Sequence, residues 1–460
     1  MVGIHVKFLI LCFFRELRVN ALIITDFRLI ILTLNRMINK RFSALIVILF
    51  PAVVLAQDFG IKFSGFVKND IIYDSRQTVS IRQGHYLLYP DKEVPDENGA
   101  DINARSTFHI LSIQSRIKAD ITAPEVLGAK PTGMIEAEFF GNIEQNINTF
   151  RLRHAYVMLS WPKTELMIGQ YWHAMFITEC FPNVVSFNTG APFQPFARNP
   201  QIRLTQKLGS FSVIGTAMSE IDFVTNGPDG PSSKYIRNAA FPELNLKFTY
   251  KWKDETSGHE LLAGVGGDYK KVQPRLVTSA NFKDSKTVSS LAWMGFLKYK
   301  IPAVTFSFEF IYGENFHSLT MLGGYAVEKV TDMERDYRSY TPIRTMSLWS
   351  DIQTNGKTWQ AGLFGGYSKN AGSVNIIDLI SEHNSSRQSE PKQIYYSRGS
   401  NIDYVYRIAP RLIYNNGRFR AAAEVEYTVA AYGQPDSEGL VQDAEEVGNF
   451  RFLLGTYIFF

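Results

Sequence analysis

The stretch Phe150-Arg-Leu-Arg-His-Ala-Tyr-Val-Met-Leu-Ser-Trp161, continued by Pro162-Lys-Thr-Glu-Leu-Met-Ile-Gly-Gln-Tyr-Trp172, decides the fold. Its first half alternates with the period of an extended strand, whose successive side chains point to opposite faces. Arg151 and Arg153 fall on one face. The opposite face is expected to carry Leu152, His154, Tyr156 and Met158. Arginines backed by apolar side chains indicate a strand with water on one side and lipid on the other.

The connections on either side of this hairpin differ in length. The turn 161–164 is tight, whereas the segment 173–200 is long, irregular and contains four prolines. A short turn at one end of a strand pair and a long loop at the other are typical of outer-membrane β-barrels.

The same pattern continues along the chain. Near-perfect alternation marks 201–208 and 243–252, and the latter ends in an aromatic outer face at Trp252. We predict strands at 61–73, 107–122, 134–140, 150–160, 165–172, 201–208, 211–219, 243–252, 259–271, 287–300, 303–313, 344–353, 357–370, 401–414, 418–431 and 449–460. This is an even number of about sixteen, as expected for a single-chain bacterial barrel.

Long and short connections alternate between these strands. Tight turns such as Asn355-Gly356 and Asn415-Asn-Gly417 carry the strongest short hairpin signal. The long, polar connections are 75–105, 173–200, 221–241, 272–286, 314–343, 371–400 and 432–448. The sequence therefore predicts an all-β fold, a transmembrane antiparallel up-and-down β-barrel with short periplasmic turns and long extracellular loops. The terminal Phe460 resembles the signal read by the barrel-assembly machinery.

The N-terminal region is predicted to be removed before folding. Residues 37–56 combine a basic start, an apolar core and Val54-Leu-Ala56 as a cleavage site, which predicts a signal peptide. Residues 1–36 are interpreted as an upstream mis-start extension; a membrane anchor is the alternative, although Asp26 and Arg28 interrupt it. A single barrel domain, 57–460, remains. Because residues 1–56 carry seven Lys or Arg and two acids, the formal charge of +4 becomes −1 without them, which gives no support for nucleic-acid binding.

Charged side chains at inward positions predict the lining of a pore. We expect a basic wall at Arg116, Lys118, Arg151, Arg153, Arg203 and Lys207. Acidic groups are expected roughly across the barrel at Glu309 and further round the wall at Glu424 and Glu426. Such an arrangement favours anions near the basic side. Glu136 and Glu138 precede the strand of Arg151 and Arg153, so a cross-strand Glu–Arg ladder is expected. The alternative is that these pairs only solvate and stiffen the wall.

The loop 173–200 is predicted to fold into the barrel and constrict it, with His173, Glu179 and Arg198 facing the path of the solute. The alternative is a loop folded outward over the rim. No catalytic motif, cofactor-binding loop or cluster of metal ligands is found in the sequence, and His154, predicted to face outward, is assigned to the membrane boundary or a subunit interface.

Several short motifs resemble those of the DcaP-like trimeric porins. They are Gly65-Phe-Val-Lys-Asn-Asp70, Gln114-Ser-Arg116, Ile135-Glu-Ala-Glu-Phe139, Arg151-Leu-Arg-His-Ala-Tyr156 and Gly169-Gln170. The resemblance implies a sixteen-stranded homotrimeric barrel that passes small negatively charged solutes such as dicarboxylates, with pore-lining roles for Arg116, Arg151 and Arg153. The family's N-terminal coiled-coil extension is not visible, since the chain enters its first strand soon after Ala56.

Together these observations predict a non-enzymatic porin in the outer membrane of a Gram-negative-type bacterium, in contact with the lipid bilayer and open to small anionic solutes. Two alternatives stay open. One is a plugged barrel that acts as an adhesin or structural protein. The other is a barrel-embedded hydrolase, for which the sequence offers no Ser–His arrangement on one outer face.

Overall fold

The computed structural model describes residues 59–141, 144–380, 383–384, 387–388 and 390–460. The predicted extension 1–36 and signal peptide 37–56 lie outside the described residues. Residues 60–460 form one compact unit, distinct from 1–59, and the description below concerns this unit. Among the described residues, no helix has the length and apolar character needed to cross a membrane.

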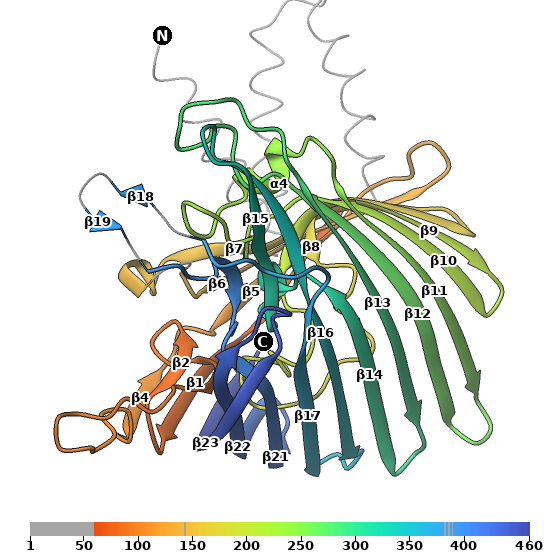
Figure 1. The fold of residues 1–460 in the computed structure, drawn as a ribbon. Helices are drawn as coiled ribbons and strands as arrows, with labels where there is room; N and C mark the ends of the chain where they lie inside the picture. The colour runs from red at the N-terminus through yellow and green to blue at the C-terminus, as the bar shows by residue number, and fades with distance from the viewer. Residues whose placement is uncertain (1–58, 142–143, 381–382, 385–386, 389) are drawn as a thin grey trace, which may run out of the picture. The chain divides into compact units, whose positions relative to one another are not determined.

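One antiparallel sheet closes on itself through β1 (Gly60–Asp74) and β23 (Val441–Phe459), which pair from Phe66↔Phe459 to Asp74↔Arg451. Between them lie β4 (Thr107–Leu111), β5 (Arg116–Thr122), β6 (Lys130–Phe139), β7 (Phe150–Ser160), β8 (Thr164–Trp172), β9 (Arg198–Leu208), β10 (Phe211–Met218), β11 (Glu243–Asp254), β12 (His259–Val272), β13 (Val288–Lys300), β14 (Val304–Glu314), β16 (Tyr337–Thr354), β17 (Trp359–Ser373), β21 (Ile402–Asn416) and β22 (Phe419–Pro435). Figure 1 shows β9 to β14 side by side and β23 beside β1.

The strand number follows from these pairings. β4 and β5 both pair with β1, at its two ends, and are therefore two halves of one wall strand. The described part of the chain thus forms a closed barrel of 16 antiparallel strands, and the predicted fold class is confirmed.

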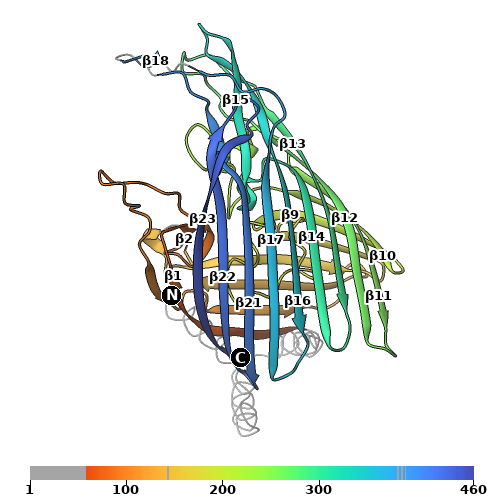
Figure 2. The same ribbon diagram turned by 60° about the horizontal axis from the view of Figure 1, so that its bottom comes forward.

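The connections at the long-loop end carry more structure than expected. The predicted loop 314–343 contains β15 (Gly323–Asp332) and the start of β16, and β15 also pairs with β20 (Tyr395–Arg398). Figure 2 shows β15 rising beyond the rest of the wall. The remaining elements are β2 (Thr78–Ile81) with β3 (Tyr86–Pro90), β18 (His383–Asn384) with β19 (Arg387–Gln388), α4 (Lys234–Asn238), η1 (Glu144–Asn146) and η2 (His317–Leu319).

A β-bulge in β7 changes which side chains face inward. The register with β6 shifts by one residue, so that Glu136 pairs with His154 and Ala137 pairs with Leu152. Arg153 is the extra residue. A shift of one residue moves every following side chain to the opposite face. Beyond the bulge it is therefore Val157, 56% exposed, that lies on the outer face.

The prediction that His154 faces outward is consequently wrong. His154 is 3% exposed and its ring packs against Tyr171 and Trp172 inside the barrel. Tyr156 and Met158 follow the same new phase and share the inner face, instead of the lipid-facing side expected for them. The strict alternation of side chains predicts the wrong face here because the pattern does not reveal an inserted residue.

The interior of the barrel contains three segments of connecting chain. The hairpin β2–β3 buries Tyr86 to Tyr89, which are 0–4% exposed. The Tyr86 hydroxyl lies 2.6 Å from Thr320 Oγ1, and the backbone N–H of Phe196 donates to the carbonyl of Leu319 at 2.9 Å. The hairpin, the loop 173–197 and the segment 315–322 thus share one apolar cluster.

The closing seam of the barrel supplies the first prediction. Arg451 on β23 donates through Nε and Nη2 to the two carboxylate oxygens of Asp74 on β1, at 2.9 and 2.7 Å, and both residues are buried. Arg451→Ala leaves the Asp74 carboxylate buried without this partner, so we expect a loss of about 3–5 kcal/mol in the free energy of unfolding.

The measurement is urea unfolding of the barrel refolded in detergent, followed by tryptophan fluorescence. Arg418→Ala is the matched control because Arg418 is exposed in the turn between β21 and β22. Equal unfolding midpoints for the two variants would contradict the role assigned to Arg451.

Candidate functional site

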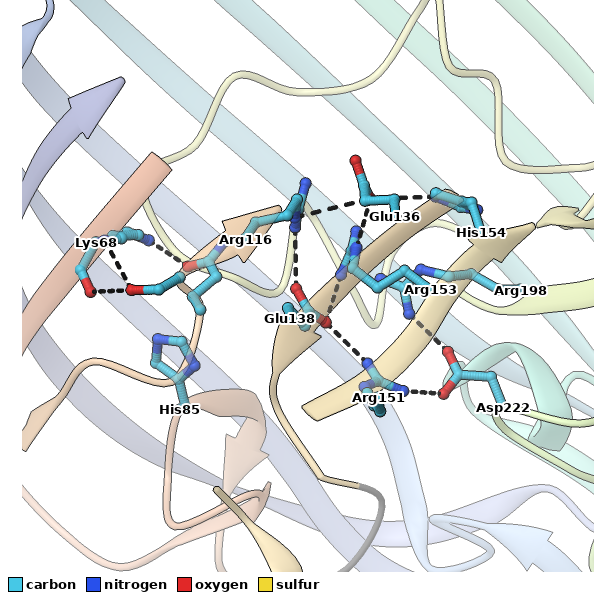
Figure 3. A network of polar contacts seen from close by, with 12 residues as sticks. Lys68, His85, Arg116, Glu136, Glu138, Arg151, Arg153, His154, Arg198 and Asp222 are labelled. Atoms are coloured by element: carbon cyan, nitrogen blue, oxygen red, sulfur yellow. Dashed lines mark hydrogen bonds and ion pairs between the residues drawn. The ribbon is translucent and has the colours of Figure 1, made fainter. Parts of the chain in front are cut away.

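A group of charged side chains lies on the inner face of β5, β6 and β7 and under the adjoining loops (Figure 3). We call it the arginine cluster. It consists of Arg82, Arg116, Arg151, Arg153, Arg198, Glu136, Glu138 and Asp222.

Cross-strand pairing places the first members. Arg116 on β5 lies opposite Glu138 on β6, and Glu138 lies opposite Arg151 on β7. Residues directly opposite each other share one face of the sheet, so the three side chains meet. Arg116 Nη2 donates to Glu138 Oε2 at 3.1 Å, and Arg151 Nη2 donates to Glu138 Oε1 at 3.0 Å. The expected Glu–Arg ladder is therefore present.

The bulge adds Arg153 to the same carboxylates. Arg153 Nε donates to Glu136 Oε1 at 2.7 Å, and its Nη1 donates to Glu138 Oε1 at 2.5 Å. Its carbonyl accepts a hydrogen bond from Gln170 Nε2, which fixes the backbone at the bulge. Glu138, which is 0% exposed, thus contacts three guanidinium groups from two neighbouring strands.

Asp222 joins the cluster from the loop after β10. Its Oδ1 accepts from Arg151 Nη1 at 2.6 Å and lies 3.7 Å from Arg82 Nη2. Its Oδ2 accepts from Arg198 Nη1 at 2.7 Å. Burial acts to raise the pKa of Asp222, but the guanidinium groups of Arg151, Arg198 and Arg82 hold that pKa well below its usual range. The carboxylate is therefore ionised at neutral pH.

The cluster has more positive than negative groups. Five guanidinium groups face three carboxylates, which leaves a formal excess of two positive charges. Arg198 is 0% exposed, yet its Nε and Nη2 donate to no group among the described residues. Buried donors without acceptors are costly, and an anion would satisfy them.

Aromatic rings line the cluster. Arg198 lies over the Trp172 ring at 4.3 Å and over the Phe196 ring at 5.1 Å, and Arg82 lies over the Phe140 ring at 4.5 Å. These faces carry negative partial charge and support guanidinium groups without neutralising them. The positive charge of the cluster is therefore not cancelled by these contacts.

Only some of the predicted basic residues join the cluster. Lys118 pairs with Asp120 at 2.8 Å and Lys207 pairs with Glu165 at 2.6 Å, both as partly exposed pairs on the wall. Arg203 donates through Nη2 to the carbonyl of Trp172 at 3.0 Å. The basic wall predicted from β5, β7 and β9 is therefore divided into the compact cluster and separate pairs.

Two of the three predicted acidic groups hold the interior loop 173–200, and the third binds a side chain of the wall. Glu424 accepts hydrogen bonds from the backbone N–H groups of Val185 and Ser186, at 2.8 and 3.0 Å. Glu426 accepts from Asn188 Nδ2 at 3.2 Å, whereas Glu309 accepts from the Trp349 indole at 2.8 Å. These carboxylates are buried and already engaged.

The strands β21 and β23 also carry inward-facing arginines that were not predicted. They are Arg407, Arg411 and Arg451, which pair with Glu426, Asp351 and Asp74. Their positions on the inward-facing side of the alternating pattern in β21 and β23 could have identified them. The contrast expected between a basic and an acidic wall is consequently weaker than predicted.

The loop 173–200 contacts the inner wall at successive points. Lys247 Nζ donates to the carbonyl of Ala174, Lys68 Nζ to that of Val185 and Arg407 Nη1 to that of Ala191. Of the residues predicted to face the solute, Arg198 joins the cluster, whereas Glu179 pairs with Lys251 at 2.7 Å. These wall donors were missed because a carbonyl acceptor in a loop leaves no mark in sequence.

His173 lies beside two carboxylates, those of Glu243 and Asp268, and ligand atoms of the three residues fall within 4.8 Å of one another. However, His173 Nδ1 accepts the backbone N–H of Met175 at 3.2 Å. A neutral ring therefore carries its proton on Nε2, which lies 3.2 Å from Glu243 Oε1. This tautomer leaves no ring lone pair for a metal ion, because Nδ1 accepts a hydrogen bond and Nε2 carries the proton.

Comparison with known proteins identifies the fold of the chain. No family model and no curated protein matches the sequence. The solved outer membrane channel DcaP of Acinetobacter baumannii has a TM-score of 0.63 and 16% identity, covering 87% of this chain and 97% of that chain. An anion-selective porin from Comamonas acidovorans has a TM-score of 0.50 and 12% identity, covering 87% and 100%. The chain therefore has a DcaP-like porin fold, as its motifs predict.

The cluster yields the second prediction. Glu138→Gln removes the negative charge that three buried guanidinium groups share, so we expect the free energy of unfolding to fall by about 3 kcal/mol. Urea unfolding in detergent micelles measures it. Glu165→Gln is the control because the Glu165–Lys207 pair is partly exposed and should cost less than about 1 kcal/mol. Similar losses in both variants would argue against a special role for Glu138.

Proposed function

We propose that the chain is an outer-membrane porin through which small polar, anionic solutes diffuse passively. The observation that carries the proposal is the excess of two positive charges in a cluster on the inner wall of the barrel. Guanidinium groups bind carboxylates in a planar, two-pronged geometry, so small carboxylates, dicarboxylates among them, are the expected solutes.

The similar folds support this proposal. One of the similar structures is described as an outer membrane channel and another as an anion-selective porin. Exposed apolar side chains such as Phe248, Val265 and Leu454 cover the outer face, as contact with lipid requires. We propose no catalytic role and no cofactor.

The proposed function also assigns roles to the other parts of the chain. Residues 37–56 act as the signal peptide, 57–460 form the barrel, the tight turns face the periplasm and Phe460 is read by the barrel-assembly machinery. The protein is proposed to be a homotrimer in the outer membrane of a Gram-negative-type bacterium.

The loop 173–200 is proposed to set the width of the pore. Its contacts with Lys68, Lys247 and Arg407 come from β1, β11 and β21, and β11 lies across the barrel from the other two strands. A loop held at such separated points crosses the lumen. The solute then passes along this loop and the arginine cluster, which share Arg198.

A plugged barrel is the second candidate, and one observation favours it. The hairpin β2–β3, the loop 173–197 and the segment 315–322 share an apolar cluster inside the barrel. In a structural protein or adhesin this cluster would stay closed and the barrel would carry no current. In a porin the same segments move or leave a path beside them.

Ion selectivity is the third prediction. Arg151→Ala and Arg153→Ala, each made singly, lower the excess positive charge of the cluster from two to one, so the preference for anions should fall. The reversal potential of single channels in a KCl gradient across a planar bilayer measures it. Arg335→Ala, which changes an exposed loop arginine, serves as the control.

Cation selectivity in the unaltered protein, or selectivity untouched by both substitutions, would overturn the assigned role of the arginines. An absence of current from correctly folded protein would favour the plugged barrel.

Release of the interior segments gives the fourth prediction. Arg407 donates at 2.9 Å to the carbonyls of Ala191 in the loop and Leu88 in the hairpin. Arg407→Ala removes both contacts, so single-channel conductance should rise or long closures should shorten. Lys369→Ala is the control because Lys369 is partly exposed and pairs with Asp403. Identical current traces would refute the idea that Arg407 restrains these segments.

A further inference from the structure

Asp222 differs from the other two carboxylates of the arginine cluster. Glu136 and Glu138 belong to β6 and are paired in register with the strands that carry their arginines. Asp222 belongs to the connection between β10 and β11 and has no strand partner. Its side chain is only 3% exposed. It can leave the cluster without breaking the wall.

The carboxylate of Asp222 is bound as a separate anion would be. Each oxygen accepts one short charge-assisted hydrogen bond, from Arg151 Nη1 at 2.6 Å and from Arg198 Nη1 at 2.7 Å. Arg82, at the tip of the β2–β3 hairpin, approaches the same group at 3.7 Å. Three guanidinium groups around one carboxylate make a strong recognition site for this chemical group.

The turn that carries Asp222 is a small unit with its own supports. Glu220 accepts hydrogen bonds from the backbone N–H and the hydroxyl of Thr225, at 2.9 and 2.7 Å, which closes the turn. His317 Nδ1 lies 3.0 Å from the carbonyl of Val224. These contacts would hold the turn near the cluster even without the contacts of Asp222.

The residue that precedes Asp222 is exposed. Ile221 is 54% exposed although Asp222 beside it is almost completely buried. The two side chains therefore lie on different sides of the turn, and that of Asp222 points into the cluster.

We propose that the position of the Asp222 carboxylate is the carboxylate-binding site of this channel, and that Asp222 is an internal occupant which an anionic solute displaces. The inference rests on the proposed function and specifies where and how the solute binds. Displacement releases the Asp222 side chain from Arg151 and Arg198 and unlinks the Arg82 hairpin from the turn, which its own contacts keep near the cluster. The unused Nε and Nη2 donors of Arg198 offer further hydrogen bonds to the incoming anion.

The proposal is tested by succinate binding to purified, detergent-solubilised protein, measured by calorimetry. Asp222→Asn keeps the size of the side chain and removes its charge, so succinate no longer competes with an internal anion. We expect the Kd for succinate to fall roughly tenfold, within the range typical of coupled binding events. Asp229→Asn is the matched control because Asp229 lies in the same loop and pairs with Lys234 at the surface.

A Kd for Asp222→Asn within about twofold of that of the unaltered protein, a weaker Kd, or no detectable binding overturns the proposal. Calorimetry reports binding whether or not the barrel conducts, whereas the reversal potential reports selectivity. Tighter binding to Asp222→Asn without anion selectivity would leave this inference standing and reject the proposed function. Unchanged binding with anion selectivity would do the reverse.

A second variant covers the case in which Asp222→Asn folds poorly. Asp222→Ala leaves a space of carboxylate size between the arginines, which free acetate can fill. We expect acetate to raise the thermal unfolding midpoint of Asp222→Ala and to have little effect on the unaltered protein or on Asp229→Ala. Equal effects of acetate on all three proteins would count against a carboxylate site at this position.

Discussion

The interior of this barrel depends on the pairing of buried charges. Glu138 is completely buried and contacts Arg116, Arg151 and Arg153, and none of these groups could stay there alone. A charge removed from water needs a partner of opposite sign with good geometry. The antiparallel register supplies it, because inward residues of adjacent strands lie opposite one another. The cluster is therefore a consequence of strand order as much as of composition.

The bulge at Arg153 shows how one inserted residue changes this pairing. Without it, Arg151 and Arg153 would both sit in the regular inward phase and His154 would face lipid. With it, Arg153 and His154 are both buried, and Arg153 reaches Glu136 as well as Glu138. Bulges re-aim side chains in this way at the edges of functional sites. The local irregularity thus turns His154 inward and lets Arg153 contact both carboxylates of β6.

Sequence alone predicted the wall well and the interior poorly, for physical reasons. Alternation and turn chemistry are local, so the sixteen strands, the tight turns and the Glu138–Arg151 pairing follow from residues close together in the chain. Asp222 was missed for two reasons. Its partners Arg151 and Arg198 lie 71 and 24 residues away in the chain, and its own loop has no alternating pattern of apolar and polar residues. The role of Arg407 was missed because it binds backbone carbonyls, which every residue possesses.

The contacts that could not be predicted follow from the way in which the inner wall uses its charged side chains. The inner wall uses its charges in two ways: in pairs within the wall, and as single donors or acceptors to the backbone of interior loops. Lys68, Lys247 and Glu424 belong to the second kind, each bound to a peptide group of the loop 173–200. Charge-assisted bonds to backbone are strong, yet they specify no side chain at the loop position. The loop can therefore vary in sequence while its contacts with the wall stay the same.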